Sequence, residues 1–246
     1  MRRIAHEKGR YGELSISDTT ELYGELGRFR ILQFADGAVQ GAIDLRDPSR
    51  VVLAYQRAIV GLMDAIRPHF TRAFVIGHGA GTIARHYGHM RIETAEINAT
   101  VVEWSRAYFG CRQSDIAIGD GRELLCKTEP GSFDYIVVDA FTADGTPPHL
   151  STLEFYSLAR ERLREGGTML LNVIGRGKGD KRIASMLATL QAVFPYAAAV
   201  SVAGPGGEAG DNLILMAGPW ETARVDMPQD CKRVAIEPGY VRRDRG

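Results

Sequence analysis

Hydrophobic and polar residues alternate along the first part of the chain. Residues 11–17, 28–34 and 38–45 each show the two-residue period of a half-buried strand, and Asp36-Gly37 is typical of a hairpin turn between the last two. We therefore expect a small antiparallel β-region over residues 1–46.

The pattern changes after this region. Asp47-Pro48 is a good helix start, and the apolar positions that follow, Tyr55 and Ile59 among them, recur at helical spacing. From residue 71, short apolar runs alternate with helical segments. The expected strands are 73–76, 92–97, 116–118, 135–139, 168–173, 197–202 and 212–216, and the expected helices are 81–87, 99–108, 122–126, 153–163 and 181–194.

This alternation predicts an α/β fold with a mostly parallel, Rossmann-like, seven-stranded sheet and helices on both faces. The sheet domain is expected over residues 47–218. Residues 219–246 are polar and contain proline, which favours a loosely packed C-terminal tail.

Composition narrows the function. The 246 residues include 30 Lys+Arg and 30 Asp+Glu, so the chain lacks the basic excess that binds nucleic acid. The cysteine count of 3, without a CxxC pair, favours reduced thiols in the cytoplasm. No apolar run suggests a signal peptide or a membrane span.

A glycine-rich loop follows the strand at 73–76 and leads into the next helix. Gly77, Gly79 and Gly81 permit a tight turn and close backbone approach to a ligand, although a turn without a ligand would need the same residues. The dinucleotide fingerprint requires a further glycine where Thr82 stands, which disfavours an NAD-dependent oxidoreductase.

Three carboxylates follow successive strands. Glu96 suits the two hydroxyls of a ribose, Asp120 before Gly121 suits an adenine amino group, and Asp139 suits the reacting end of a nucleoside. A solvated strand end, an Asp-Gly turn and a loop cap are the respective structural alternatives. Together, at the edge where open α/β sheets bind ligands, the three predict a nucleoside site.

The ordered set resembles the spermidine synthase family, of class I methyltransferase-like fold, over about residues 10–217. The shared features are the Tyr55-bearing helix, Gly-His-Gly-Ala-Gly at 77–81, Glu96, Gly-Asp-Gly at 119–121, Val138-Asp139, the loop at 144–150, the Glu-Phe-Tyr at 154–156 and the Arg-Glu-Gly-Gly-Thr turn.

The resemblance implies an enzyme that transfers an aminopropyl group from decarboxylated S-adenosylmethionine to an amine. It implies that Glu96 holds ribose, Asp120 holds adenine and Asp139 is the catalytic acid/base. Tyr55, Asp144 and His149 are the candidate substrate-binding residues. Family members commonly associate through their N-terminal sheets, so the resemblance implies that the strands over residues 10–45 would permit a homodimer.

The chain departs from the family pattern at three positions. Ala80 replaces an aspartate of the glycine loop, Thr142 replaces a second loop aspartate, and Arg57 replaces the glutamate that follows the tyrosine. A dication such as putrescine needs carboxylates at both ends of its slot. Putrescine is therefore doubtful as the acceptor.

The departures leave alternatives open. The donor could be S-adenosylmethionine itself, with methyl or aminocarboxypropyl transfer, or the chain could be an inactive nucleoside-binding protein. His78 is expected to be an exposed loop histidine without a role. His86 and His89 lack an HExxH frame, so no metal site is expected.

Overall fold

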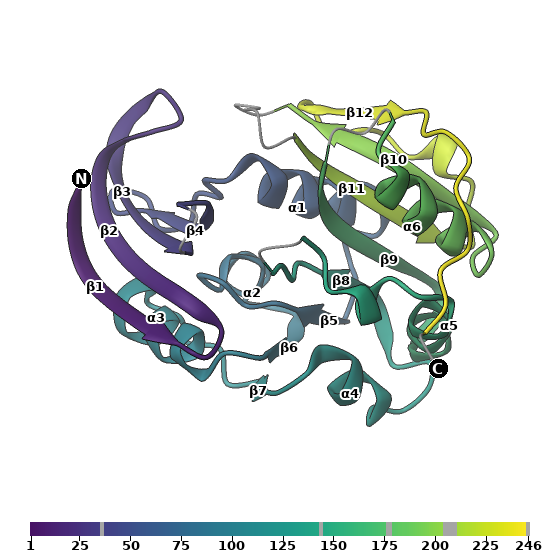
Figure 1. Ribbon diagram of the computed structural model, residues 1–246, viewed down its shortest axis with the longest axis horizontal. Helices are drawn as coiled ribbons and strands as arrows, with labels where there is room; N and C mark the ends of the chain where they lie inside the picture. Colours follow the sequence, from purple (N-terminus) through teal and green to yellow (C-terminus); the bar gives the residue numbers. More distant parts are fainter. Residues whose placement is uncertain (35–36, 143–144, 176–178, 204–210, 245–246) are drawn as a thin grey trace.

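The computed structural model describes residues 1–34, 37–142, 145–175, 179–203 and 211–244 (Figure 1). At one side of the molecule, a four-stranded antiparallel sheet follows chain order. Its strands are β1 (Arg2–Gly9), β2 (Gly12–Leu22), β3 (Glu25–Phe34) and β4 (Val39–Asp44). Asp36, half of the predicted hairpin turn, lies outside the described residues.

The N-terminal β-region thus has one strand more than we predicted. β1 is rich in charged residues and mostly exposed, and it pairs only with β2, at the sheet edge. An edge strand that buries little needs no apolar alternation, so its sequence does not reveal it.

The second sheet has eight strands in the order β12-β10-β11-β9-β8-β5-β6-β7. The five neighbours from β9 to β7 are parallel, whereas β11 and β12 run antiparallel to the strands beside them. The strands are β5 (Arg72–Ile76), β6 (Arg91–Glu96), β7 (Ile116–Ile118), β8 (Phe133–Val138), β9 (Leu163–Gly175), β10 (Tyr196–Val202), β11 (Asp211–Gly218) and β12 (Cys231–Val234). The mostly parallel, Rossmann-like arrangement is confirmed, with one strand beyond the seven expected.

Helices cover both faces of this sheet (Figure 1). α1 (Ala54–Ile66) and α2 (Thr82–His86) share a core with one set of strand residues. α4 (Gly121–Cys126), α5 (Leu153–Arg162) and α6 (Lys181–Gln191) share a core with the alternate set. α3 (Ala99–Phe109) packs against the N-terminal sheet. The short helices are η1 (Pro148–Leu150) and η2 (Thr222–Arg224).

The helix expected from Asp47-Pro48 begins later, at Ala54. The Asp47 side chain accepts hydrogen bonds from Ser49, and its carbonyl accepts one from Arg50 N. Pro48 therefore lies in an Asx-type turn that precedes the helix.

The C-terminal segment contacts the main domain. β12 joins the sheet beside β10, Leu153 N donates to Arg242 O at 2.8 Å, and Arg122 forms two hydrogen bonds with Asp244. Only Cys231 of β12 is buried, so its sequence resembles a polar loop. The domain boundaries and the homodimer stay predictions. Within the described ranges, no helix has the length and apolar character needed to span a membrane.

Candidate active site

The glycine loop lies between β5 and α2, at the carboxyl edge of the parallel strands. Gly77, Gly79 and Gly81 have φ angles of 100°, 53° and 70°, a backbone region that residues other than glycine rarely adopt. A Cβ on Gly77 would also collide with the carbonyl oxygen of Asp139. The loop therefore passes directly over the end of β8, which brings it next to the candidate catalytic carboxylate.

Glu96 ends β6 and supports this loop from behind. Its Oε2 accepts a hydrogen bond from His78 N and its Oε1 accepts one from Asn98 N, both at 2.9 Å. Burial raises the pKa of Glu96, and the surrounding backbone N–H groups oppose that shift. Backbone N–H groups of Asn98, His78, Ile97 and Gly79 all interact with this carboxylate, which fixes its position beneath the loop.

Asp120 precedes α4 and caps it. Its Oδ1 accepts from Arg122 N at 2.9 Å and Glu123 N at 3.0 Å. Gly121 packs so closely on Ile76 that a Cβ there would clash. The remaining oxygen, Oδ2, lies 2.8 Å from His149 Nε2. The structure thus brings His149 to the proposed adenine end of the site.

Asp139 directly follows β8 and belongs to a polar cluster. Its Oδ1 accepts a hydrogen bond from Asn172 Nδ2 at 2.9 Å, and Asn172 Oδ1 in turn accepts one from Asn212 Nδ2 at 2.9 Å. Burial raises the pKa of Asp139 to about 6, with the charge of Glu96 acting in the same direction. Hydrogen bonds from Asn172 and Tyr55 oppose this shift. A carboxylate with this pKa can accept a proton near neutral pH.

Tyr55 lies in α1, and its hydroxyl faces Asp139. Burial, the Asp139 charge and the hydrogen bond to Asp139 raise the pKa of Tyr55 well above its ordinary value. The hydroxyl therefore stays protonated and can donate. The hydroxyl also lies 3.3 Å from Gln40 O, and it accepts a hydrogen bond from Gln56 Nε2 at 3.3 Å.

Two further polar residues at this site were not singled out from the sequence. Gln56 and Thr82 are each 3% exposed, and neither Gln56 Oε1 nor Thr82 Oγ1 has a hydrogen-bond partner among the described residues. Both line a small cavity together with Gly77, His78 and Asp139. Buried polar atoms without partners are costly, so a water or a ligand atom in this cavity would stabilise them. Asn172 is a third site residue that the sequence analysis did not identify. It could have been recognised as a polar residue that interrupts an apolar strand.

His78 is buried, contrary to our expectation of an exposed histidine. It is 7% exposed, and its Nε2 lies 2.8 Å from Ser105 Oγ of α3. Burial, with the positive charges of Arg106 and Arg85, lowers the pKa of His78 to about 4. The side chain thus ties the loop to α3 as a neutral imidazole.

A neutral buried histidine predicts acid sensitivity. The unfolded chain binds a proton at His78 below about pH 6.5, whereas the folded chain does so only near pH 4. The contribution of neutral His78 to the unfolding free energy is therefore fully present above pH 6.5, and it decreases as the pH falls toward 4. In urea titrations at pH 7 and pH 4, we expect wild type to lose about 3 kcal/mol more unfolding free energy than His78→Gln. The exposed His86→Gln serves as the control and should behave as wild type; an equal loss in all three proteins would contradict the assignment.

The three departures from the family pattern have clear positions. Ala80 is fully buried and packs against Gly41 of β4. Arg57 is exposed, and its Nη1 donates to Val52 O at 2.5 Å. Thr142 Oγ1 donates to Gly145 O at 3.0 Å, within its own turn. None of the three supplies a carboxylate to the site, and Asp144 lies outside the described residues. Among the residues described, no group of His, Cys, Asp or Glu could hold a metal ion.

The fold is that of class I methyltransferase-like proteins, with acidic residues at the ends of β6, β7 and β8. The model of the spermine/spermidine synthase domain family matches residues 52–205, more than half of the chain. The chain therefore belongs to the spermine/spermidine synthase family. Membership also confirms the predicted enzyme class, a transferase.

Individual relatives agree with this assignment. A polyamine aminopropyltransferase of Neisseria meningitidis serogroup A is 29% identical, over 78% of this chain and 72% of the relative. A probable polyamine aminopropyl transferase of Bifidobacterium longum is 29% identical over 56% of this chain, which spans only 32% of that relative. The crystal structure of a probable spermidine synthase from Corynebacterium glutamicum superposes with a TM-score of 0.76, at 25% identity, over 88% of this chain and 80% of the other.

Proposed function

We propose that this chain is an aminopropyltransferase-type enzyme that moves an alkyl group from an S-adenosyl sulfonium donor to an amine. The Asp139 cluster carries the proposal. A carboxylate with its pKa raised to about 6 stands beside the glycine loop, oriented by Tyr55 and Asn172. Glu96 would hold the ribose, Asp120 the adenine, and the loop at Gly77–Gly81 the sulfonium-bearing chain.

The step itself is a displacement at carbon. The lone pair of the amine nitrogen forms the new C–N bond, while the C–S bond breaks and its electrons pass to sulfur, leaving a thioether. The nitrogen then carries an extra proton. Asp139 accepts a hydrogen bond from the attacking amine and takes that proton. Only a neutral amine can attack, so proton removal and alignment supply the catalysis.

The acceptor is an amine with fewer positive charges than the diamines typical of the family. Arg57 directs its guanidinium to backbone carbonyls, and Thr142 bonds within its own turn, so neither offers a charged partner to a distal ammonium. A second ammonium would then enter the site without the charge-assisted hydrogen bonds that hold it in a carboxylate-lined slot. This reasoning supports a monoamine over putrescine.

One observation favours a second candidate, in which the donor is S-adenosylmethionine and a methyl or aminocarboxypropyl group moves. Ala80 stands where the family has an aspartate, and it is buried against Gly41. A site without that carboxylate repels the carboxylate of S-adenosylmethionine less.

Calorimetric titration separates the two donors. We expect decarboxylated S-adenosylmethionine to bind at least about tenfold more tightly than S-adenosylmethionine, equivalent to about 1.4 kcal/mol. Methylthioadenosine serves as a control for the nucleoside site itself. A reversed preference would support the second candidate, and no binding of any of the three would refute the nucleoside site.

A further inference from the structure

A second cavity adjoins the glycine loop, with Gly81 in its lining and Asp139 outside it. It has a volume of about 380 Å³ and is lined in part by α2 and by the segment between α3 and β7. Its chemistry-bearing lining residues are Arg85, Arg91, Cys111, Arg112, Gln113 and Asp115. Cavities of this size accommodate small ligands.

Two of these arginines lack a carboxylate partner among the described residues. Arg85 Nη1 makes only long hydrogen bonds, 3.3 Å to Ala80 O and 3.4 Å to Phe109 O, and its buried Nη2 has no partner within the described ranges. Arg112 is exposed at the cavity rim. A partly buried guanidinium without a counter-charge is destabilising. An anion in the cavity would satisfy it.

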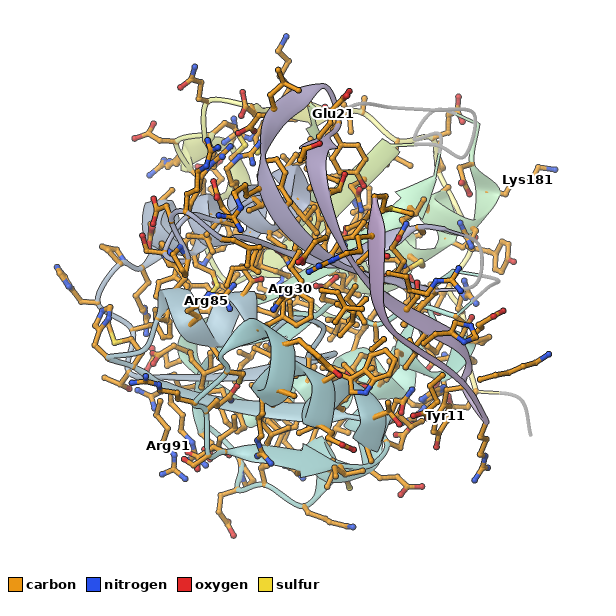
Figure 2. All side chains as sticks on the ribbon, turned by 90° about the vertical axis from the view of Figure 1, so that its left-hand side faces the viewer. Tyr11, Glu21, Arg30, Arg85, Arg91 and Lys181 are labelled. Carbon is orange, nitrogen blue, oxygen red and sulfur yellow. The ribbon has the colours of Figure 1, made fainter. Side chains whose placement is uncertain are left out.

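The third arginine is already neutralised. Arg91 lies 2.9 Å from Glu93 and 3.8 Å from Asp115. Figure 2 shows Arg85 and Arg91 on the same side of the molecule. The cavity therefore has uncompensated positive charge at Arg85 and Arg112, with Asp115 as its one lining acid.

We propose that this cavity binds a small molecule through an oxyanion group, a phosphate or a carboxylate. Arg85 and Arg112 would hold the oxyanion in a forked, charge-assisted contact, the geometry in which guanidinium groups bind such groups best. Gln113 and Ser114, which also line the cavity, supply uncharged polar groups for the rest of the ligand.

The site has a structural connection to the donor site. Gly81 and Ala84 line both this cavity and the small cavity beside Asp139. The Sγ of Cys111 lies so close to Gly81 that a Cβ there would be 3.2 Å from it. A bound anion would therefore contact the glycine loop and change donor affinity. This consequence, unlike the site itself, depends on the proposed function.

Cys111 provides a readout that does not depend on activity. Cys126 is exposed and Cys231 is buried, so Cys126→Ser leaves Cys111 as the reactive thiol. In this background, we would measure its alkylation by the uncharged reagent iodoacetamide at increasing phosphate and, separately, acetate, with sodium chloride keeping the ionic strength constant. We expect saturable slowing by at least one of the two anions. Slowing by phosphate alone identifies a phosphate site, and slowing by acetate identifies a carboxylate site.

Variants assign the effect to the arginines. Arg112→Gln changes an exposed residue and should fold, and it should weaken protection about tenfold, the effect of losing one charge-assisted contact. Arg85→Gln should act similarly, whereas Lys127→Gln, an exposed cation away from the cavity, should not. Absence of saturable protection, or equal protection in all variants, would overturn the site. Unchanged methylthioadenosine affinity with the anion bound would refute only the coupling.

Discussion

Asp139→Asn is expected to lower kcat by about 10² to 10⁴-fold, the usual contribution of a positioned general base. The amide is nearly the same size and can still interact with Asn172 and Tyr55, but it cannot take a proton from the attacking amine. The variant should therefore bind methylthioadenosine normally. Retained binding with lost turnover would also exclude the alternative of an inactive nucleoside-binding protein.

The pH dependence of activity distinguishes a general base at Asp139 from a residue that only supports the structure. Since the pKa of Asp139 is about 6, wild-type kcat/KM should fall about tenfold per pH unit below pH 6, and this break should be absent from the variant. The measurement is methylthioadenosine release from decarboxylated S-adenosylmethionine with a set of mono- and diamines. Asp226→Asn, at an exposed carboxylate outside the site, is the matched control. If the variant kept wild-type turnover or the same break, Asp139 would not be the base.

The parallel sheet could be predicted because its strands are buried on both faces. Val137 contributes to the core beneath α1, and Val138 contributes to the core beneath α5 and α6, so β8 is a continuous apolar run. β1 and β12 escaped prediction for the opposite reason. Both are edge strands with few buried residues, and backbone pairing with one neighbour, which leaves little trace in sequence, holds each in place.

The candidate site was only partly predictable, for a related reason. Glu96, Asp120 and Asp139 follow strands, and the ends of parallel strands meet at one edge by topology alone. The orientation of a side chain depends instead on tertiary contacts. His78 turns toward Ser105 in α3, and Asn172 reaches Asp139 from a neighbouring strand, and neither contact has a sequence spacing that reveals it.

Glu96→Gln is expected to weaken binding of methylthioadenosine about 30-fold. Two ribose hydroxyls would lose a charged acceptor, and each charge-assisted hydrogen bond is worth about 1 kcal/mol more than a neutral one. The amide also cannot accept from both His78 N and Asn98 N, because one of its ends is a donor. Calorimetry gives the affinity, and Glu93→Gln, earlier in the same strand, is the control.

A thermodynamic cycle separates ribose binding from support of the loop. Removing the 2′-hydroxyl from methylthioadenosine should cost wild type about tenfold in affinity and the Glu96→Gln variant much less, because the acceptor is already altered. The difference between the two costs is the coupling between Glu96 and that hydroxyl. If both proteins lost the same affinity for the deoxy ligand, Glu96 would act only by holding the His78 and Asn98 backbone. The ribose would then bind elsewhere on the loop.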